Sequence, residues 1–108
     1  MPPGGEDAAR GFYRDLLGMS EEAKPAELAS RGGCWFRSGH LRLHLGVEAA
    51  FRPARKAHPA MRVSGLEDLV ATLAAAGCTV REDCDFEGSA RVYADDPFVN
   101  RIELLADV

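Results

Sequence analysis

Apolar residues predict a helix near the start of the chain. Between Glu6 and Leu17 they recur every three or four residues and form one stripe. The stripe consists of Ala8, Ala9, Phe12, Tyr13, Leu16 and Leu17. Acidic Glu6 and Asp7 in the first turn suit the helix dipole, and Gly18 follows as a helix-ending glycine. The pattern therefore predicts a helix over residues 6–17.

A link without a clear period follows this helix. Residues 19–32 read as irregular, and Gly32-Gly33 ends the segment. Lys24-Pro25 opens a short helical stretch through Ala29. One more short strand around 26–31 is the alternative for the same residues.

The next two segments predict a hairpin. Aromatic-rich residues 34–37 read as one strand, Ser38-Gly39 as a turn and residues 40–47 as the returning strand. Polar and apolar residues alternate along the returning strand. Its apolar face holds Leu41, Leu43, Leu45 and Val47, and its other face holds His40, Arg42, His44 and Gly46.

The second half of the chain predicts a strand, a helix and three further strands. The first strand covers residues 57–63. Ser64 and Glu67 form a capping box at the start of the helix, and Gly77 ends it. The buried stripe of this helix is Leu66, Leu69, Val70 and Leu73. The remaining strands are expected at 79–83, 90–94 and 101–105.

The two halves read as similar modules, so the chain is predicted to be a single α+β domain. Module one covers about residues 1–50, and module two covers about residues 57–108. Two βαβββ modules would form a curved mixed sheet with the helices outside. Module one lacks its opening strand, because this sequence starts at the helix. The sheet face away from the helices would form a concave, polar-lined pocket.

Polar side chains of several strands are expected on this pocket face. They are His44, His58, Glu103, Arg42 and Arg62. Two imidazoles and one carboxylate suit a divalent metal and leave positions open for water or substrate. A solvated sheet face without metal explains the same alternation, and spacing alone does not decide between the two.

Composition narrows the classes of function. The chain has 108 residues, a net charge of −4 and 46% apolar residues, which suits one soluble domain and disfavours a nucleic-acid-binding role. No apolar run reaches the about 18 residues of a membrane helix, and the N-terminus does not resemble a signal peptide. Three cysteines without a CxxC pair fit reduced thiols. We therefore expect a cytoplasmic protein.

Three segments carry a resemblance to a known family. Residues 6–18 (EDAARGFYRDLLG) resemble the first helix of vicinal oxygen chelate proteins. Residues 56–59 (KAHP) and 65–69 (GLEDL) resemble the start of their second module, and residues 93–104 (YADDPFVNRIEL) resemble their closing signature. Together and in this order, the segments indicate the glyoxalase, bleomycin-resistance and extradiol-dioxygenase superfamily.

The resemblance implies a metal site and a ligand pocket. Metal-binding members take ligands from the first and last strands of each module, which implies His44, His58 and Glu103 here. Glu103 would also be catalytic. Arg42, Arg62 and Tyr93 would contact the substrate. The ion would be Fe, Mn, Ni or Zn, unless the site works without one, and the chain would form a homodimer that binds a small molecule.

Two departures from the family pattern affect this prediction. The family's first strand, which usually carries an early ligand, has no counterpart before Glu6. Its absence leaves unpaired backbone on a neighbouring strand. In addition, Val99 stands where the closing signature has glycine. If that turn requires a positive φ, the valine is strained there.

Three functions remain open from the sequence. The first is a metal-dependent lyase, isomerase or dioxygenase that acts on a small oxygenated molecule. The second is a metal-free binding protein of the antibiotic-sequestering kind. The third is a truncated, inactive remnant. Retention of the His/His/Glu set favours the enzyme, and the missing first strand favours the other two.

Overall fold

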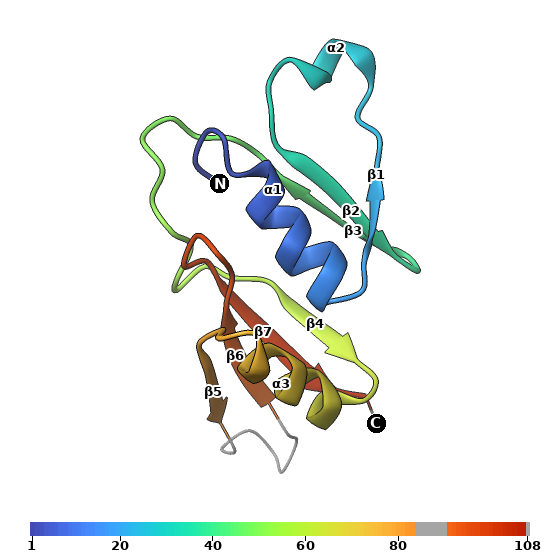
Figure 1. Ribbon diagram of the computed structural model, residues 1–108, viewed down its shortest axis with the longest axis vertical. Helices are drawn as coiled ribbons and strands as arrows, with labels where there is room; N and C mark the ends of the chain where they lie inside the picture. Colours follow the sequence, from blue (N-terminus) through green and yellow to red (C-terminus); the bar gives the residue numbers. More distant parts are fainter. Residues whose placement is uncertain (84–90, 108) are drawn as a thin grey trace. The chain divides into compact units, whose positions relative to one another are not determined.

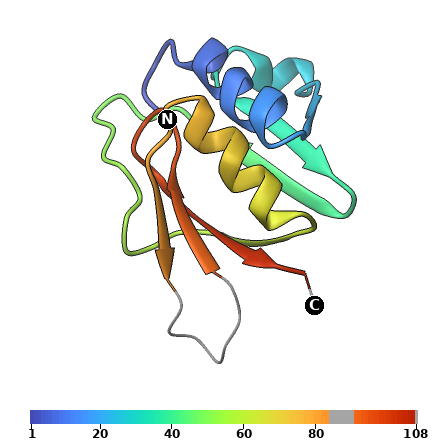
Figure 2. The ribbon, with the colours of Figure 1, turned by 60° about the horizontal axis from the view of Figure 1, so that its bottom comes forward.

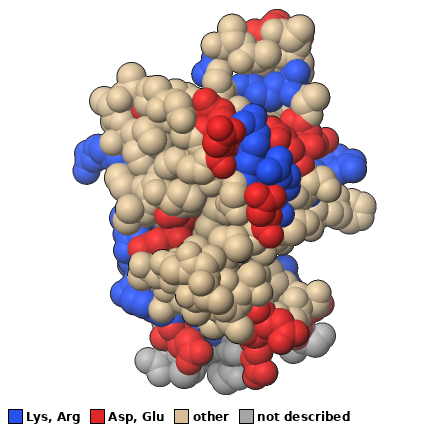
Figure 3. All heavy atoms as spheres, in the orientation of Figure 1, with Lys and Arg blue, Asp and Glu red and all other residues tan. Residues whose placement is uncertain are grey.

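A computed structural model describes residues 1–83 and 91–107 of the chain (Figure 1). These residues separate into two units, Met1–Arg52 and Pro53–Val108, each with helix and sheet. The predicted α+β class is confirmed. Cys84 and the expected start of a strand at residue 90 lie outside the described residues. In the part of the chain that is described, no helix is long and apolar enough to cross a membrane. Acidic and basic side chains are interleaved on the face shown in Figure 3.

Unit one contains helical segments and a three-stranded antiparallel sheet. Its elements are α1 (Glu6–Ala9), the π-helix η1 (Arg10–Leu16), β1 (Ser20–Glu22), α2 (Ala26–Ala29), β2 (Cys34–Ser38) and β3 (Leu41–Leu45). The strand order is β1-β2-β3. The predicted hairpin is confirmed, with Trp35 opposite His44 and Phe36 opposite Leu43.

The link between the first helix and the hairpin differs from the prediction. Its strand is β1, which pairs with β2 and lies before the proposed strand at 26–31. The latter segment instead contains the helical turn α2, where the Pro25 carbonyl accepts hydrogen bonds from the N–H groups of Leu28 and Ala29. The alternative strand is therefore wrong, because this backbone satisfies its hydrogen bonds locally.

The first helix is wider than the predicted α-helix over most of its length. From Arg10 onward it is a π-helix, and the Leu17 N–H donates to the Phe12 carbonyl five residues back. The apolar pairs of this helix repeat every four residues. One of these pairs, Phe12 and Tyr13, is buried.

Aromatic residues form the core of unit one. Tyr13 stacks on Phe36 of β2 with 5.5 Å between ring centroids, and Phe12 meets Tyr13 edge-on at 4.9 Å. Cys34 is buried beside them at the start of β2, and its Sγ lies 3.9 Å from the Glu6 carbonyl oxygen. The helix is thus fixed on the sheet by one face.

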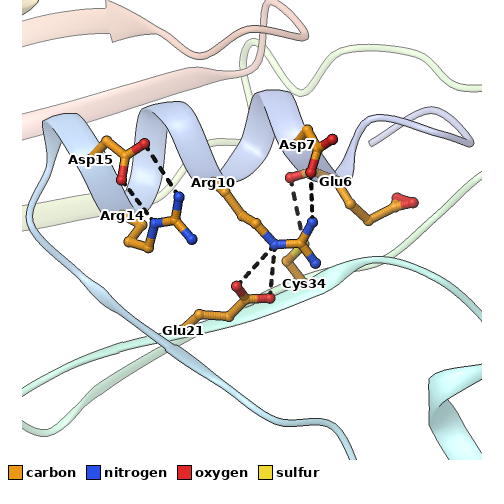
Figure 4. A network of polar contacts seen from close by, with 7 residues as sticks. All are labelled: Glu6, Asp7, Arg10, Arg14, Asp15, Glu21 and Cys34. Carbon is orange, nitrogen blue, oxygen red and sulfur yellow. Dashed lines mark hydrogen bonds and ion pairs between the residues drawn. The ribbon is translucent and has the colours of Figure 1, made fainter.

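An ion-pair network joins the first helix to β1 (Figure 4). Arg10 donates from Nε to both carboxylate oxygens of Glu21, at 2.9 and 3.2 Å, and from Nη1 to Asp7 at 2.9 Å. Arg14 pairs with its neighbour Asp15. Arg10 is therefore the arginine of this network that connects two elements.

Met1 lies alongside the chain that leaves β3. Its amino group donates to the Gly46 carbonyl at 2.8 Å, and the Glu48 N–H donates to the Met1 carbonyl at 3.0 Å. This is the hydrogen-bond pattern of a parallel bridge. In unit two, a full strand makes the corresponding parallel pairing with the last strand of the module.

Unit two is a complete βαβββ module, as predicted. Its elements are β4 (Ala60–Val63), α3 (Leu66–Ala75), β5 (Val80–Asp83), β6 (Arg91–Asp95) and β7 (Arg101–Ala106). The strand order is β4-β7-β6-β5. The first pair is parallel and the other two pairs are antiparallel, so the sheet is mixed.

The start of α3 differs from the predicted capping box. Gly65 is the N-cap, with φ 67°, and no side chain caps the helix. The chain needs a left-handed residue to turn from β4 into α3, and glycine adopts this conformation without strain. Ser64 therefore lies one residue too early, and the capping box with Glu67 is wrong. Gly77, with φ 83°, follows the helix end as predicted.

Helix α3 covers one face of the unit-two sheet (Figures 1 and 2). Leu66 and Leu73 of the helix are buried. Alternate strand residues are buried with them, namely Met61, Val92, Ala94, Ile102 and Leu104. Because strand side chains alternate, the opposite face holds the residues between them, including Tyr93 and Glu103. This second face is the polar one.

Candidate metal and ligand site

The loop before β4 is tied to the turn before β7. The Ala54 N–H donates to Asn100 Oδ1 at 2.9 Å, and the Arg101 N–H donates to the Ala54 carbonyl at 2.7 Å. Arg55 donates from Nη1 to Asp95 Oδ1 at 2.7 Å. Arg55 is therefore held in place by the turn. These contacts fix the path of the loop that carries His58.

The turn itself is organised by buried Asp96. Its Oδ1 accepts from the N–H groups of Phe98 and Asn100, and its Oδ2 accepts from the Asn100 side-chain amide. Val99 has φ 67°, which places a β-branched residue in the left-handed region. The expected strain at Val99 is thus present, directly before the strand that carries Glu103.

His58 and Glu103 form the centre of the candidate site. His58 Nε2 lies 2.9 Å from Glu103 Oε1. His58 Nδ1 lies 3.0 Å from each of the carbonyl oxygens of Arg55 and Lys56. Both ring nitrogens therefore face acceptors. His58 lies in the loop and not in the strand, because β4 begins at Ala60 and the predicted start at residue 57 was too early.

His58 Nε2 and Glu103 Oε1 are atoms of the kind that bind a divalent metal ion. A neutral ring that donates Nδ1–H to the backbone directs its Nε2 lone pair toward the Glu103 carboxylate. A cation close to Nε2 and Oε1 then satisfies both acceptors. Among residues 1–83 and 91–107, however, no group of three or more His, Cys, Asp or Glu side chains could hold a metal.

His44, the third predicted ligand, lies in unit one. Its ring stacks on Trp35 of the neighbouring strand, with 3.9 Å between centroids and 3° between planes. The alternation of β2 thus places Trp35 with His44, while Phe36 is buried on the other face. The structure brings His58 and Glu103 together, and His44 remains a predicted ligand.

The predicted substrate residues have different surroundings. Arg42 pairs with Glu22 at 3.1 Å, so its charge is already matched within unit one. Arg62 is exposed on β4, and its register opposite Leu105 places it on the polar face of the unit-two sheet. Tyr93 lies directly opposite Glu103, and its ring meets that of His58 edge-on at 5.5 Å.

Three arginines surround Tyr93 and were not predicted as site residues. The guanidinium carbons of Arg91 and Arg101 each lie 5.2 Å from the ring centroid, and that of Arg81 lies 6.0 Å away. Arg91 also approaches Glu103 Oε2 at 3.7 Å. We call Arg81, Arg91, Arg101 and Tyr93 the arginine–tyrosine cluster. By strand alternation, Arg91 lies on the same face as Tyr93, and Arg101 lies on the same face as Glu103. A count of the basic residues on this face of the predicted strands could therefore have identified the three arginines from the sequence.

The described cysteines lie outside this site. Cys34 and Cys78 are free thiols. Burial raises the pKa of both, which favours the neutral thiol over the nucleophilic thiolate. Both are therefore structural residues and not candidate nucleophiles.

Comparisons with known proteins identify the fold and the family. The sequence matches no protein-family model and no curated protein. A crystal structure of a glyoxalase family protein from Bacillus anthracis is 42% identical, with a TM-score of 0.94, over 100% of this chain and 88% of that chain. Two more distant structures share the fold. Lactoylglutathione lyase from Agrobacterium tumefaciens is 21% identical (TM-score 0.73), over 93% of this chain and 84% of that chain. A fosfomycin resistance protein from Listeria monocytogenes is 14% identical (TM-score 0.75), over 94% and 84%.

These similarities agree with the motifs in the sequence. The complete βαβββ module of unit two, the His58–Glu103 pair and the closing signature all lie within the aligned chain. The predicted resemblance is confirmed. The chain therefore belongs to the glyoxalase family, within the vicinal oxygen chelate superfamily.

Proposed function

We propose that the protein is a divalent-metal-dependent enzyme that acts on a small oxygenated molecule. The contact between His58 Nε2 and Glu103 Oε1 carries this proposal. Both side chains are largely shielded, with exposed fractions of 16% and 14%, so solvent competes weakly for them. A surface pair without a function has no need of the backbone contacts that orient the His58 ring.

In this proposal, His58 and Glu103 hold the ion, and His44 is the proposed third ligand. A bound divalent ion would polarise a substrate oxygen as a Lewis acid. His58 keeps its ring orientation through the Arg55 and Lys56 carbonyls. Glu103 is the proposed catalytic residue. Its Oε1 contacts His58, and its Oε2 would accept a substrate proton. Arg91 Nη1 lies 3.7 Å from this second carboxylate oxygen.

The relatives support this class of substrate without selecting one reaction. One structural neighbour is named as a lyase of lactoylglutathione, another as a glyoxalase/dioxygenase and another as a fosfomycin resistance protein. These names span different chemistry on small oxygenated molecules. We therefore propose a lyase, an isomerase or a dioxygenase for this chain.

A metal-free binding protein is the second candidate. The flat stack of Trp35 and His44 favours it, because a half-buried indole beside an imidazole offers a platform for a planar ligand. In that case His44→Ala would weaken ligand binding through lost stacking, and Glu103→Ala would leave it unchanged. The metal-dependent enzyme requires both residues.

A cytoplasmic homodimer is a further part of the proposal. The described free cysteines fit a reducing compartment. In the sheet order β1-β2-β3, β3 is an edge strand that pairs with β2 on one side. Met1 adds a single bridge beyond the end of β3. Strand edges of this kind favour association with another chain. Light scattering of the purified protein should give twice the 11.7 kDa mass of one chain. A monomer mass at all concentrations would contradict the dimer.

Metal analysis tests the proposed function. Protein purified without chelators should contain close to one equivalent of a divalent metal, or should gain thermal stability on addition of Mn²⁺, Fe²⁺, Ni²⁺ or Zn²⁺. Glu103→Gln keeps the shape of the side chain but removes its charge, so it should abolish this gain. Glu67→Gln removes one exposed carboxylate on α3 and serves as the matched control. No metal and no thermal shift with any of the four ions would refute the proposal.

A further inference from the structure

We propose that the arginine–tyrosine cluster binds an oxyanion group of the substrate. The cluster lies on the polar face of the unit-two sheet, beside Glu103. The inference names the substrate class of the proposed site and to that extent rests on the proposed function. Anion binding by the arginines does not itself require a metal.

Strand register creates the cluster. Arg81 on β5, Tyr93 on β6 and Glu103 on β7 stand directly opposite one another. Arg91 is two residues from Tyr93 on the same strand, and Arg101 is two residues from Glu103. Side chains that are opposite or diagonal on one face are within reach of each other. The strand register therefore brings three cations close to one aromatic ring.

Stacking on the tyrosine leaves the arginines ready to bind an anion. A guanidinium within about 6 Å of an aromatic ring is attracted to its face. When the plane of the guanidinium lies along the ring, its N–H groups point outward at the edges. These edges form the fork that binds carboxylate or phosphonate oxygens in two parallel hydrogen bonds. Tyr93 thus positions the cations without neutralising them.

The charges of this face do not balance among the described side chains. Four arginines share it by register: Arg62, Arg81, Arg91 and Arg101. Three carboxylates share the face by the same register: Asp83, Asp95 and Glu103. Asp95 is already paired with Arg55. Glu103 is left to face both His58 and Arg91. By register, the four arginines outnumber the three carboxylates of this face, and an anionic ligand would reduce this excess of positive charge.

Within the cluster, Arg101 gives the most specific indication that a ligand binds there. Its Nε is buried and has no hydrogen-bond partner among the described residues. Buried polar groups are usually hydrogen-bonded, and an unsatisfied donor costs free energy. A ligand oxygen beside Arg101 would satisfy it. The exposed Arg81, on the other side of Tyr93, could approach the same ligand from solvent.

The substrate class that fits is a small molecule with a carboxylate or phosphonate group near its reacting oxygens. The cluster would hold the anionic end while Glu103 faces the reacting part of the molecule. The two anion types share the same chemistry, and the experiment distinguishes them.

Nuclear magnetic resonance of the arginine side chains tests the inference. Full-length ¹⁵N-labelled protein, stripped of metal, is titrated with methylphosphonate, acetate and uncharged acetamide at constant ionic strength. The Nε–H signals of Arg81 and Arg101 should shift and saturate with methylphosphonate or acetate, but not with acetamide. The anion with the lower dissociation constant identifies the preferred group.

Variants show whether the arginines bind the anion. Arg81→Gln and Arg101→Gln should each weaken binding about tenfold, because each removes a charge-assisted hydrogen bond. Arg81 is exposed, so its variant keeps the test valid if Arg101→Gln fails to fold. Arg31→Gln removes an exposed charge in unit one and should leave binding unchanged. Equal binding by wild type, Arg81→Gln and Arg101→Gln, or equal shifts with acetamide, would overturn the inference.

A parallel Zn²⁺ titration separates this inference from the proposed function. Arg81→Gln should keep metal binding, because Arg81 contacts neither His58 nor Glu103 among the contacts described. If anions bind as expected but no metal binds, the oxyanion site stands and the metal-dependent enzyme is refuted. If metal binds but no anion shift saturates, the inference is wrong and the enzyme proposal stands.

Discussion

At the scale of single residues, Val99 and Arg101 depart from what local chemistry prefers. Val99 adopts a left-handed conformation that suits glycine, and Arg101 buries an Nε donor that has no hydrogen-bond partner among the described residues. Both flank the start of β7, the strand that carries Glu103. Strain of this kind persists only where surrounding contacts impose it, and here Asp96 and Asn100 impose the turn.

Val99→Gly should stabilise the protein. A β-branched residue in the left-handed region costs about 1–2 kcal/mol, and glycine loses about 0.5–1 kcal/mol of that gain to unfolded-state entropy. We expect a net gain of about 1 kcal/mol and a rise of about 4 °C in the melting temperature. Thermal unfolding measures it. Val99→Ala, which keeps a Cβ, should gain less. A melting temperature of Val99→Gly at or below that of wild type would show that the turn is not strained.

Some of the site residues could be placed from the sequence, and others could not. Strand alternation placed Glu103 on the polar face, and the Val99 strain followed from the closing signature. The position of His58 in a loop did not follow, because hydrogen bonds with the turn, not local pattern, decide where β4 begins. The stack of Trp35 and His44 depended on the register of the hairpin, which was predicted only as a pairing.

At the scale of elements, long patterned segments were predictable and short polar ones were not. α3 and the strands of unit two follow the apolar period of their sequences. β1 is Ser-Glu-Glu, which has no apolar alternation, and it is a strand because it pairs with β2. The π-helical turns of η1 also escaped prediction, because an apolar period does not distinguish hydrogen-bond spans of four and five residues.

Arg10→Gln should destabilise unit one, whereas Arg14→Gln should not. Hydrogen bonding to Glu21 raises the pKa of Arg10, and this contact joins the helix to β1. We expect a loss of about 0.5–1 kcal/mol, since the partners remain partly exposed to water. Arg14 pairs with its own neighbour on the helix surface, so its loss should leave the urea midpoint unchanged. Equal midpoints for the two variants would show that the Arg10 network adds no stability.

At the scale of the whole molecule, two modules of related order make up the chain. Unit two is a full βαβββ module, and unit one has a helix, three strands and the single bridge of Met1. This order, and the family to which it belongs, could be predicted from three short motifs. The candidate site could be predicted only in part, because residues far apart in sequence meet through tertiary structure. The structure described here joins His58 with Glu103.

Calorimetric titration of Zn²⁺ or Mn²⁺ into variants of the three histidines tests the central claim most directly. His40, His44 and His58 are the histidines of the chain, so three single alanine variants cover every imidazole. The account predicts that His40→Ala binds like wild type, that His44→Ala binds more weakly, and that His58→Ala and Glu103→Gln lose binding by about 10- to 100-fold. Wild-type affinity in folded His58→Ala and Glu103→Gln, or no binding by wild type, would contradict it.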